Sequence, residues 1–305
     1  MDIQAIINQM IVLFILIALG YFIGKTSLLT AEGVKALSRI VLYIALPCTV
    51  LNSVMSGDLD ITGAETAIFT LTSLLATVLH LVIAFPAVRL LGADKGKRGI
   101  YMYMAAFGNV ANMGFPVTIA ILGTASAFYV SIYNIPYVLI CYSLGIMMVS
   151  GKSGGFNVKK LLNPALIAGV IAVMIVVTGL KTPGIIVGAV GLISGVTTPG
   201  AMLIIGASLS RISFKDAFSD WRLYPVALLK LIIMPVIIWL IFRPFVTNDM
   251  ALGVLVILSG MASGAMATIF AIEYGGDERA ASSGVFLTTL LSCVTIPLVA
   301  YFLLA

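Results

Sequence analysis

The chain has 305 residues, of which 61% are hydrophobic and only 10% are charged, and its mean hydropathy is +1.17. Soluble domains carry about 25% charged residues, so this composition excludes an ordinary soluble protein and indicates an integral membrane protein in contact with the lipid bilayer. The net charge of +5 therefore bears on orientation in the membrane, and we expect no nucleic-acid partner.

A transmembrane helix needs about 20 apolar residues, and ten stretches of the chain meet this requirement. In chain order they lie at 4–24, 37–56, 64–88, 99–122, 125–149, 163–180, 184–209, 222–242, 250–272 and 280–304. We therefore predict an all-α polytopic membrane protein with ten transmembrane helices joined by short loops.

The longest connection between spans, 150–162, is rich in glycine, serine and lysine, as flexible linkers are. We expect a cytoplasmic linker at 151–162 that joins a first five-helix repeat, 1–150, to a second, 163–305. Because each repeat has an odd number of spans, the two must enter the membrane from opposite sides, which makes a five-plus-five inverted repeat.

A shift of 152 residues supports this division of the chain. Without a gap it superposes predicted span on predicted span, and three pairs of helix-breaking residues coincide: Pro47 with Pro199, Gly108 with Gly260, and Gly123 with Gly275.

The distribution of basic residues predicts the orientation. Fourteen of the 17 Lys and Arg lie on one side of the predicted spans, whereas Lys181 and Arg243 lie on the other and Lys230 lies within a span. Because loops rich in Lys and Arg stay in the cytoplasm, we expect a multi-pass protein of the cell (inner) membrane with both termini outside the cytoplasm.

Two helix-breaking runs, Gly108–Pro116 and Gly260–Gly264, interrupt spans four and nine. Such interruptions at corresponding places in two halves are the best sequence indication of a transporter's substrate site. Non-helical backbone at membrane depth is tolerated only where it is buried in protein or lines a wet cavity. The residues that we predict to form the crossover and its hinges are Gly108, Gly114, Pro116, Gly260, Gly264, Pro47 and Pro199.

Asn109 and Asn112 are the polar side chains within the first of these runs. They are three residues apart and share a face if the segment stays helical there. Their amides, together with backbone amides of the half-helix that resumes near Pro116, would hold a carboxylate, which a helix N-terminus favours. The alternative role is a polar contact between helices.

Lys230 lies about nine residues into span eight, at a depth where a charge costs about 2.5 kcal/mol or more. We predict a fixed positive charge that faces the broken helices and either replaces a bound sodium ion or attracts an anionic substrate. The alternative is a lysine that snorkels to the cytoplasmic face. His80, in span three, lies two residues from the position equivalent to Lys230 under the 152-residue shift; it is either a packing residue or a group that handles protons or substrate.

Further candidates for substrate contact are Asn52, Thr49, Ser263, Tyr133 and Asn134, each with packing as the alternative. Gly20 and Gly24 have the spacing of a helix-packing motif.

Several chemistries are not expected. No Asp or Glu lies in the middle of a predicted span, and His80 is the single histidine. Ion-coupled carriers usually keep a buried carboxylate, and membrane enzymes need paired acids or a metal-binding cluster. We therefore predict no enzyme activity, no metal ion and no cofactor.

Several stretches together resemble the auxin efflux carrier family, which includes bacterial dicarboxylate permeases and plant auxin carriers. They are Val41–Pro47, Gly108–Pro116, Asn163-Pro164, Thr198-Pro199, Gly206–Leu209, Glu273–Glu278, and Lys230 followed by Pro235. The resemblance covers nearly the whole chain. It implies ten spans in an inverted repeat, with spans four and nine unwound and crossing at mid-membrane, and an organic anion bound there through its carboxylate.

The resemblance also implies a scaffold of helices from both halves, often dimeric, that supports a mobile transport unit. Asn109 stands where plant-type members have a substrate-contacting asparagine. One departure is that members commonly carry a proline in span nine, whereas 259–272 has none; Gly260 and Gly264 must permit the break instead.

These features predict a secondary transporter of small organic anions, such as malate, malonate or an indole acid, that works by an elevator-like or rocking alternation of access. Its partners would be the anion, the lipid bilayer and a second copy in a homodimer. The alternatives are a sodium-coupled symporter of the bile acid carrier type and a membrane sensor that has a transporter fold without transporting.

Overall fold

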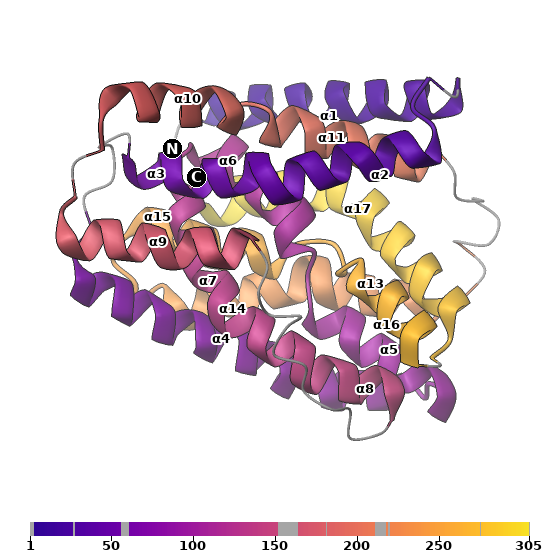
Figure 1. The fold of residues 1–305 in the computed structure, drawn as a ribbon. Helices are drawn as coiled ribbons and strands as arrows, with labels where there is room; N and C mark the ends of the chain where they lie inside the picture. Colours follow the sequence, from indigo (N-terminus) through magenta and orange to yellow (C-terminus); the bar gives the residue numbers. More distant parts are fainter. Residues whose placement is uncertain are drawn as a thin grey trace. The chain divides into compact units, whose positions relative to one another are not determined.

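The computed structural model describes residues 3–26, 28–55, 61–151, 164–180, 182–210, 218, 220–274 and 276–304. Over these ranges all regular structure is helical apart from one antiparallel bridge between Gly108 and Ser263 (Figure 1). The predicted all-α class is confirmed. The predicted linker lies outside the described residues except for Gly151, as do Asn163, Lys181 and Gly275.

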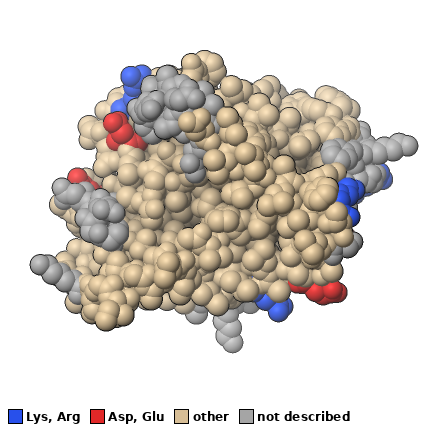
Figure 2. Space-filling model, turned by 90° about the horizontal axis from the view of Figure 1, so that it is seen from above, with Lys and Arg blue, Asp and Glu red and all other residues tan. Residues whose placement is uncertain are grey.

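Within the described ranges, six helices are long and apolar enough to cross a membrane: Ala31–Met55, Gly63–Leu90, Ser126–Ser150, Gly184–Leu209, Leu223–Phe242 and Glu278–Leu304. Shorter apolar helices occupy Ile11–Lys25, Val110–Leu122, Pro164–Thr178 and Asp249–Ser259. Large apolar side chains point outward, with Ile185 and Leu192 exposed by 89% and 83%, and charged side chains are few on the face drawn in Figure 2. Soluble proteins rarely expose such surface, so the chain is a polytopic membrane protein; ten spans and an inverted repeat stay predictions.

The chain forms two compact units. Unit 1 comprises Met1–Thr72, Ala111–Ile135 and Leu161–Arg211, and unit 2 comprises Ser73–Val110, Pro136–Lys160 and Ile212–Ala305. Each unit therefore contains segments from both predicted repeats, and neither unit coincides with a predicted half of the sequence.

Unit 1 is built from α1 (Ile3–Lys25), α2 (Ala31–Ile40), η1 (Val41–Ala45), α3 (Leu46–Met55), α6 (Phe115–Leu122), α9 (Pro164–Thr178), α10 (Gly184–Ser194) and α11 (Thr197–Leu209), with η2 (Val110–Gly114) and the first parts of α4 (Gly63–Leu90) and α7 (Ser126–Ile140). Helices α1 and α11 pack closely because glycines line their contact. A Cβ on Gly20 would lie 2.6 Å from the Leu203 carbonyl oxygen, and one on Gly24 would lie 2.8 Å from the Cα of Ala207. The predicted packing role of Gly20 and Gly24 is confirmed.

Unit 2 contains the rest of α4 and α7, α5 (Lys95–Ala106), η3 (Cys141–Gly145), α8 (Ile146–Ser150), α13 (Leu223–Leu228), η5 (Leu229–Ile233), α14 (Met234–Phe242), α15 (Asp249–Ser259), α16 (Met266–Tyr274) and α17 (Glu278–Leu304). Aromatic rings fill its core. Phe270 of α16 packs edge-on against Tyr103 of α5 and Tyr142 of η3, with centroids 5.7 and 5.5 Å apart, and Phe107 packs against Tyr137 at 5.7 Å.

Three π-helical turns, η1, η2 and η5, each end two residues before a proline, at Pro47, Pro116 and Pro235. A proline within a helix has no N–H to donate, and its ring collides with the carbonyl four residues earlier. A π turn widens the helix by one residue at that point and relieves the collision. The predicted kink at Pro47 is thus a widened turn in a continuous helix.

The predicted span 184–209 is one apolar stretch, Gly184–Leu209, long enough to cross a membrane. Near Pro199 it is interrupted by two turn residues, Gly195 and Val196, so that α10 ends at Ser194 and α11 begins at Thr197. Gly195 is the residue four before Pro199, where a regular helix would place its carbonyl against the proline ring. The predicted irregularity near Pro199 therefore lies in the turn before Thr197.

Candidate functional site: the crossing of two interrupted helices

Both predicted interruptions are present. Helix α5 ends at Ala106 and helical structure resumes with η2 at Val110, while α15 ends at Ser259 and α16 begins at Met266. After the first break, helical structure resumes earlier than predicted. Gly114 therefore lies in η2, and Pro116 lies in the first turn of α6. Asn109 lies before the restart, in non-helical backbone, so the argument for a helical face shared with Asn112 does not apply.

The two interruptions lie against each other within unit 2. The Asn109 N–H donates to the Ala262 carbonyl at 2.7 Å, and the Gly264 N–H donates to the Phe107 carbonyl at 3.0 Å. These are the hydrogen bonds of the bridge between Gly108 and Ser263. Each break thus supplies partners for the other's backbone, which hydrocarbon cannot do.

Side chains complete the hydrogen bonding of the crossing. The Ser263 hydroxyl donates to the Met104 carbonyl at 3.0 Å, and the Ser263 N–H donates to Oγ1 of Thr288 at 3.1 Å. The Tyr137 hydroxyl donates to the Gly108 carbonyl at 2.5 Å. Tyr137 and Thr288 were not predicted, because nothing near them in the sequence indicates that they reach a break elsewhere in the chain. Ser263 is fully buried and connects the two interrupted helices; its role as a substrate ligand stays a prediction.

Small residues allow this close approach of two backbones. A Cβ on Gly264 would lie 3.1 Å from the Gly108 carbonyl oxygen, and one on Gly108 would lie 3.2 Å from the Cβ of Met261. A Cβ on Gly260 would lie 3.3 Å from the Pro235 ring. The second break therefore forms without a proline of its own.

Lys230 belongs to the π turn η5, and its side chain is only 1% exposed. Its Nζ donates to the carbonyl of Ala106, the last residue of α5, at 3.4 Å, and lies 3.4 Å from the point where a Cβ of Gly108 would sit. A helix C-terminus carries partial negative charge, which a cation stabilises. The ammonium therefore faces the first break and does not extend to an aqueous surface.

His80 of α4 is also 1% exposed and lies where the charge of Lys230 acts on its ring. The ring hydrogen-bonds the Ala76 carbonyl one turn earlier. Within the described part of the chain, its Nε2 has no hydrogen-bond partner. Two buried basic groups therefore lie beside the crossing.

The side-chain amide of Asn109 is half-buried at the crossing. Among the residues that the structure describes, it forms no hydrogen bond with the protein, in contrast to its backbone N–H. An amide that has both a donor and an acceptor free, close to a break, is available to a ligand.

The remaining candidates lie in unit 1. The Thr49 hydroxyl is buried and contacts Oγ1 of Thr197 at 2.7 Å, so it connects α3 to α11. Oδ1 of Asn52 lies 3.3 Å from the point where a Cβ of Gly191 would sit. Also in unit 1 are Asn112, Tyr133, Asn134, Pro47 and Pro199. A role of any of these in substrate binding stays a prediction.

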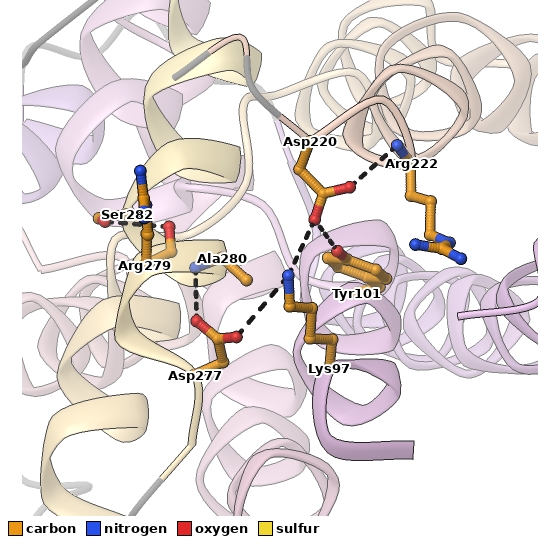
Figure 3. A network of polar contacts seen from close by, with 8 residues as sticks. All are labelled: Lys97, Tyr101, Asp220, Arg222, Asp277, Arg279, Ala280 and Ser282. Atoms are coloured by element: carbon orange, nitrogen blue, oxygen red, sulfur yellow. Dashed lines mark hydrogen bonds and ion pairs between the residues drawn. The ribbon is translucent and has the colours of Figure 1, made fainter. Parts of the chain in front are cut away.

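A polar cavity of about 440 Å³ in unit 2 was not predicted from the sequence, because its residues come from distant positions. Lys97 of α5 pairs with Asp220 at 3.3 Å and Asp277 at 3.9 Å (Figure 3). Tyr101 donates to the Asp220 carboxylate, as does the Arg222 N–H at 3.1 Å. Partial burial opposes ionisation of Asp220, but these hydrogen bonds and Lys97 outweigh it and hold the Asp220 pKa below its ordinary value.

Comparisons with known proteins place these features in context. Residues 5–159 and 153–300 match a family model described as membrane transport protein, and the matched ranges include both breaks and Lys230. The chain is 29% identical to an uncharacterized transporter of Methanothermobacter thermautotrophicus, over 93% of this chain and 94% of that protein. It is 25% identical to the uncharacterized transporter MJ1031 of Methanocaldococcus jannaschii, over 97% and 98% of the two chains. It is 24% identical to the uncharacterized transporter YfdV of Escherichia coli, over 97% and 96%.

Proposed function

Because the chain belongs to the membrane transport protein family, whose members are transporters of the auxin efflux carrier type, we propose that it is a secondary transporter of small organic anions that bind through a carboxylate. The observation that carries the choice of an anion is the buried ammonium of Lys230 beside the crossing, in a region where no described Asp or Glu is buried. An unpaired charge in a dry interior is costly. An incoming carboxylate removes that cost.

In this proposal the carboxylate binds at the crossing in unit 2. The free amide of Asn109 donates to one carboxylate oxygen, and Lys230 supplies the countercharge across the break. Gly108 and Gly264 let the two breaks pack against each other beside that site. Access then alternates between the two membrane faces by an elevator-like or rocking motion.

A sodium-coupled symporter is the competing function, because backbone carbonyls at a break bind sodium without a carboxylate. The position of Lys230 supports the anion carrier instead. Its ammonium already donates to the carbonyl at the end of α5, where a bound cation would otherwise be needed.

The test is binding of potassium malate, malonate and indole-3-acetate to purified protein, followed by the shift in thermal unfolding temperature with and without sodium. A ligand stabilises the native state according to its concentration relative to Kd. We expect stabilisation by at least one of the three anions, independent of sodium. Asn109→Ala should weaken that binding by about tenfold to a hundredfold, since a hydrogen bond to a charged group is worth about 1.5–3 kcal/mol.

Asn8→Ala, which removes an exposed amide on α1, is the matched control and should bind as the wild type does. Asn112→Ala, measured in parallel, tests the second predicted asparagine. Wild-type affinity in Asn109→Ala would contradict the site. Stabilisation by sodium alone would favour the symporter, and flux of the bound anion into liposomes that contain only this chain would exclude a non-transporting sensor.

A further inference from the structure

Lys230 and His80 are two buried basic groups, and in the part of the chain that the structure describes each has hydrogen-bonding capacity that the protein does not use. In the described part of the chain, the single hydrogen bond of the Lys230 ammonium is the one to Ala106 at 3.4 Å, although an ammonium has three N–H donors. The Nε2 of His80 is buried without a partner. Both side chains are 1% exposed.

The hydrogen bond from His80 to Ala76 defines which ring nitrogen is the base. Because Nε2 has no partner, the hydrogen bond to Ala76 belongs to Nδ1, and since a backbone carbonyl only accepts, Nδ1 must carry the proton that it donates. In the neutral ring the other nitrogen, Nε2, then holds a free lone pair. A buried lone pair therefore lies within electrostatic range of a buried ammonium whose N–H groups are mostly unused.

Of the other titratable side chains near these elements, Tyr137 donates to the Gly108 carbonyl at the crossing, and the rest belong to separate groups. On α5, Lys97 and Tyr101 take part in the network around Asp220, and Tyr103 bonds Cys141 at 3.2 Å. On α17, Cys293 donates to the Thr289 carbonyl. Other titratable groups on packed elements are near helix ends or exposed: Arg98, Tyr224, Glu278 and Arg279. No described carboxylate is buried to neutralise Lys230.

A buried ammonium that lacks a countercharge is relieved either by loss of a proton or by arrival of an anion. From this juxtaposition we infer that Lys230 and His80 form the proton site of the transporter, which takes up one proton as the anion binds and releases it as the anion leaves. Lys230 is the ammonium in the loaded state. On release, the lysine side chain moves until its Nζ can donate to Nε2 of His80 and gives it the proton, leaving a neutral amine and an imidazolium, and the imidazolium returns the proton to water.

This inference rests on the proposed function and adds that the anion travels with a proton. The protein then needs no carboxylate for ion coupling, because two bases and the substrate's own charge perform that task. The tests below separate coupling from transport itself.

The first test uses liposomes that contain the wild-type protein, with the membrane potential clamped by potassium and valinomycin. Exchange of labelled for unlabelled malate at equal pH on both sides reports transport without net proton movement. Accumulation of malate driven by an acidic outside pH reports coupling. We expect both in the wild type, and we expect His80→Gln to keep exchange but lose accumulation.

Thr77→Val is the matched control for His80→Gln, because Thr77 is buried on the same helix with its hydroxyl bonded to Ser73. It should retain both activities. Wild-type exchange without gradient-driven accumulation would overturn the inference but leave the proposed function intact, as would normal accumulation in His80→Gln. Absence of exchange for malate and for every anion found to bind would overturn both.

The second test measures proton uptake when malate binds to detergent-solubilised protein in weakly buffered solution at about pH 7.5, where malate is fully ionised. The wild type should take up protons on binding, up to about one per site. Lys230→Arg, measured at malate concentrations that saturate its weaker site, should show no proton uptake, because guanidinium stays charged. Uptake equal to wild type in Lys230→Arg would contradict the assignment of the proton to Lys230.

The third measurement needs no variant, because His80 is the only histidine of the chain. Nitrogen NMR of protein with labelled histidine reports its tautomer directly. We expect Nδ1 protonated and Nε2 unprotonated in the malate-bound protein. A proton on Nε2 in that state would overturn the inference, even if every substituted protein failed to fold.

Discussion

At the scale of single residues, the backbones of the two breaks lie so close together that there is no space for an added side-chain atom. Gly264 approaches the Gly108 carbonyl so closely that a Cβ there would lie 3.1 Å from the oxygen. Lys230, Ser263 and Tyr137 each use their polar atoms on backbone groups of the breaks. At the crossing, two of the predicted substrate ligands, Lys230 and Ser263, are thus occupied with non-helical backbone, whereas the side-chain amide of Asn109 forms no hydrogen bond with the described part of the protein.

Gly264→Ala should destabilise the protein, because two backbones must move apart by a few tenths of an ångström. Overpacking of this kind costs about 1–3 kcal/mol. The measurement is the thermal unfolding temperature in detergent. Gly188→Ala in α10 is the control, because a Cβ at Gly188 would meet no atom within 4 Å. Equal stability of the two variants would show that the crossing is not tightly packed.

Asp220 gives a prediction about pH. Its pKa in the folded protein lies below the ordinary value of 3.8, so its ionised form stabilises the fold at neutral pH, and this contribution is lost as pH falls through the folded-state pKa. Asp220→Asn should destabilise the protein by about 1 kcal/mol at neutral pH, the worth of a hydrogen bond on a partly exposed group. The difference in unfolding temperature between the variant and the wild type should shrink as pH falls from about 7 to about 3. A difference that is the same at both pH values would refute the role of the Asp220 charge.

At the scale of elements, η5 is the π turn that carries Lys230, and it ends two residues before Pro235. Pro235→Ala restores an N–H and removes the ring that the π turn accommodates. We expect α13 and α14 to join as one regular helix, which turns Lys230 by about 100° relative to α14, since one residue is about 100° of α-helix. Malate affinity should then fall by about tenfold, the effect of losing one charge-assisted contact.

Pro297→Ala is the matched control for Pro235→Ala, because Pro297 lies inside α17, which has no π turn. Its malate affinity should equal that of the wild type. If both variants bind malate normally, the widened turn does not set the position of Lys230.

At the scale of the whole molecule, the asymmetry of basic residues predicts the orientation in the membrane. Lys97, Arg222 and Arg279, predicted to lie on one side, line the same cavity, which is the arrangement that the prediction requires. We expect this side to face the cytoplasm.

Labelling of intact cells with a membrane-impermeant maleimide tests the orientation, in protein whose three cysteines have been replaced. Arg243→Cys, on the opposite predicted side and exposed, should react from outside, whereas Glu278→Cys, exposed at the start of α17, should react only after the cells are opened. The reverse pattern would place both termini in the cytoplasm.

The sequence by itself determined the class of this protein and the position of its breaks. Long apolar stretches indicate membrane helices, and the helix-breaking runs placed the interruptions at Gly108 and at Gly260–Gly264, because those signals are local. The rest of the first run, from Val110 to Pro116, is helical. The close packing of Gly20 and Gly24 followed from their spacing in the same way.

Only the tertiary structure decided which groups meet. The antiparallel bridge between Gly108 and Ser263, the hydrogen bond from Tyr137 to Gly108 and the proximity of His80 to Lys230 join residues far apart in the chain. Their partners are chosen by packing, which no local pattern encodes. For the same reason each compact unit contains segments of both predicted repeats. A repeat is a pattern that recurs along the sequence, whereas a unit is a set of segments whose surfaces are buried against one another.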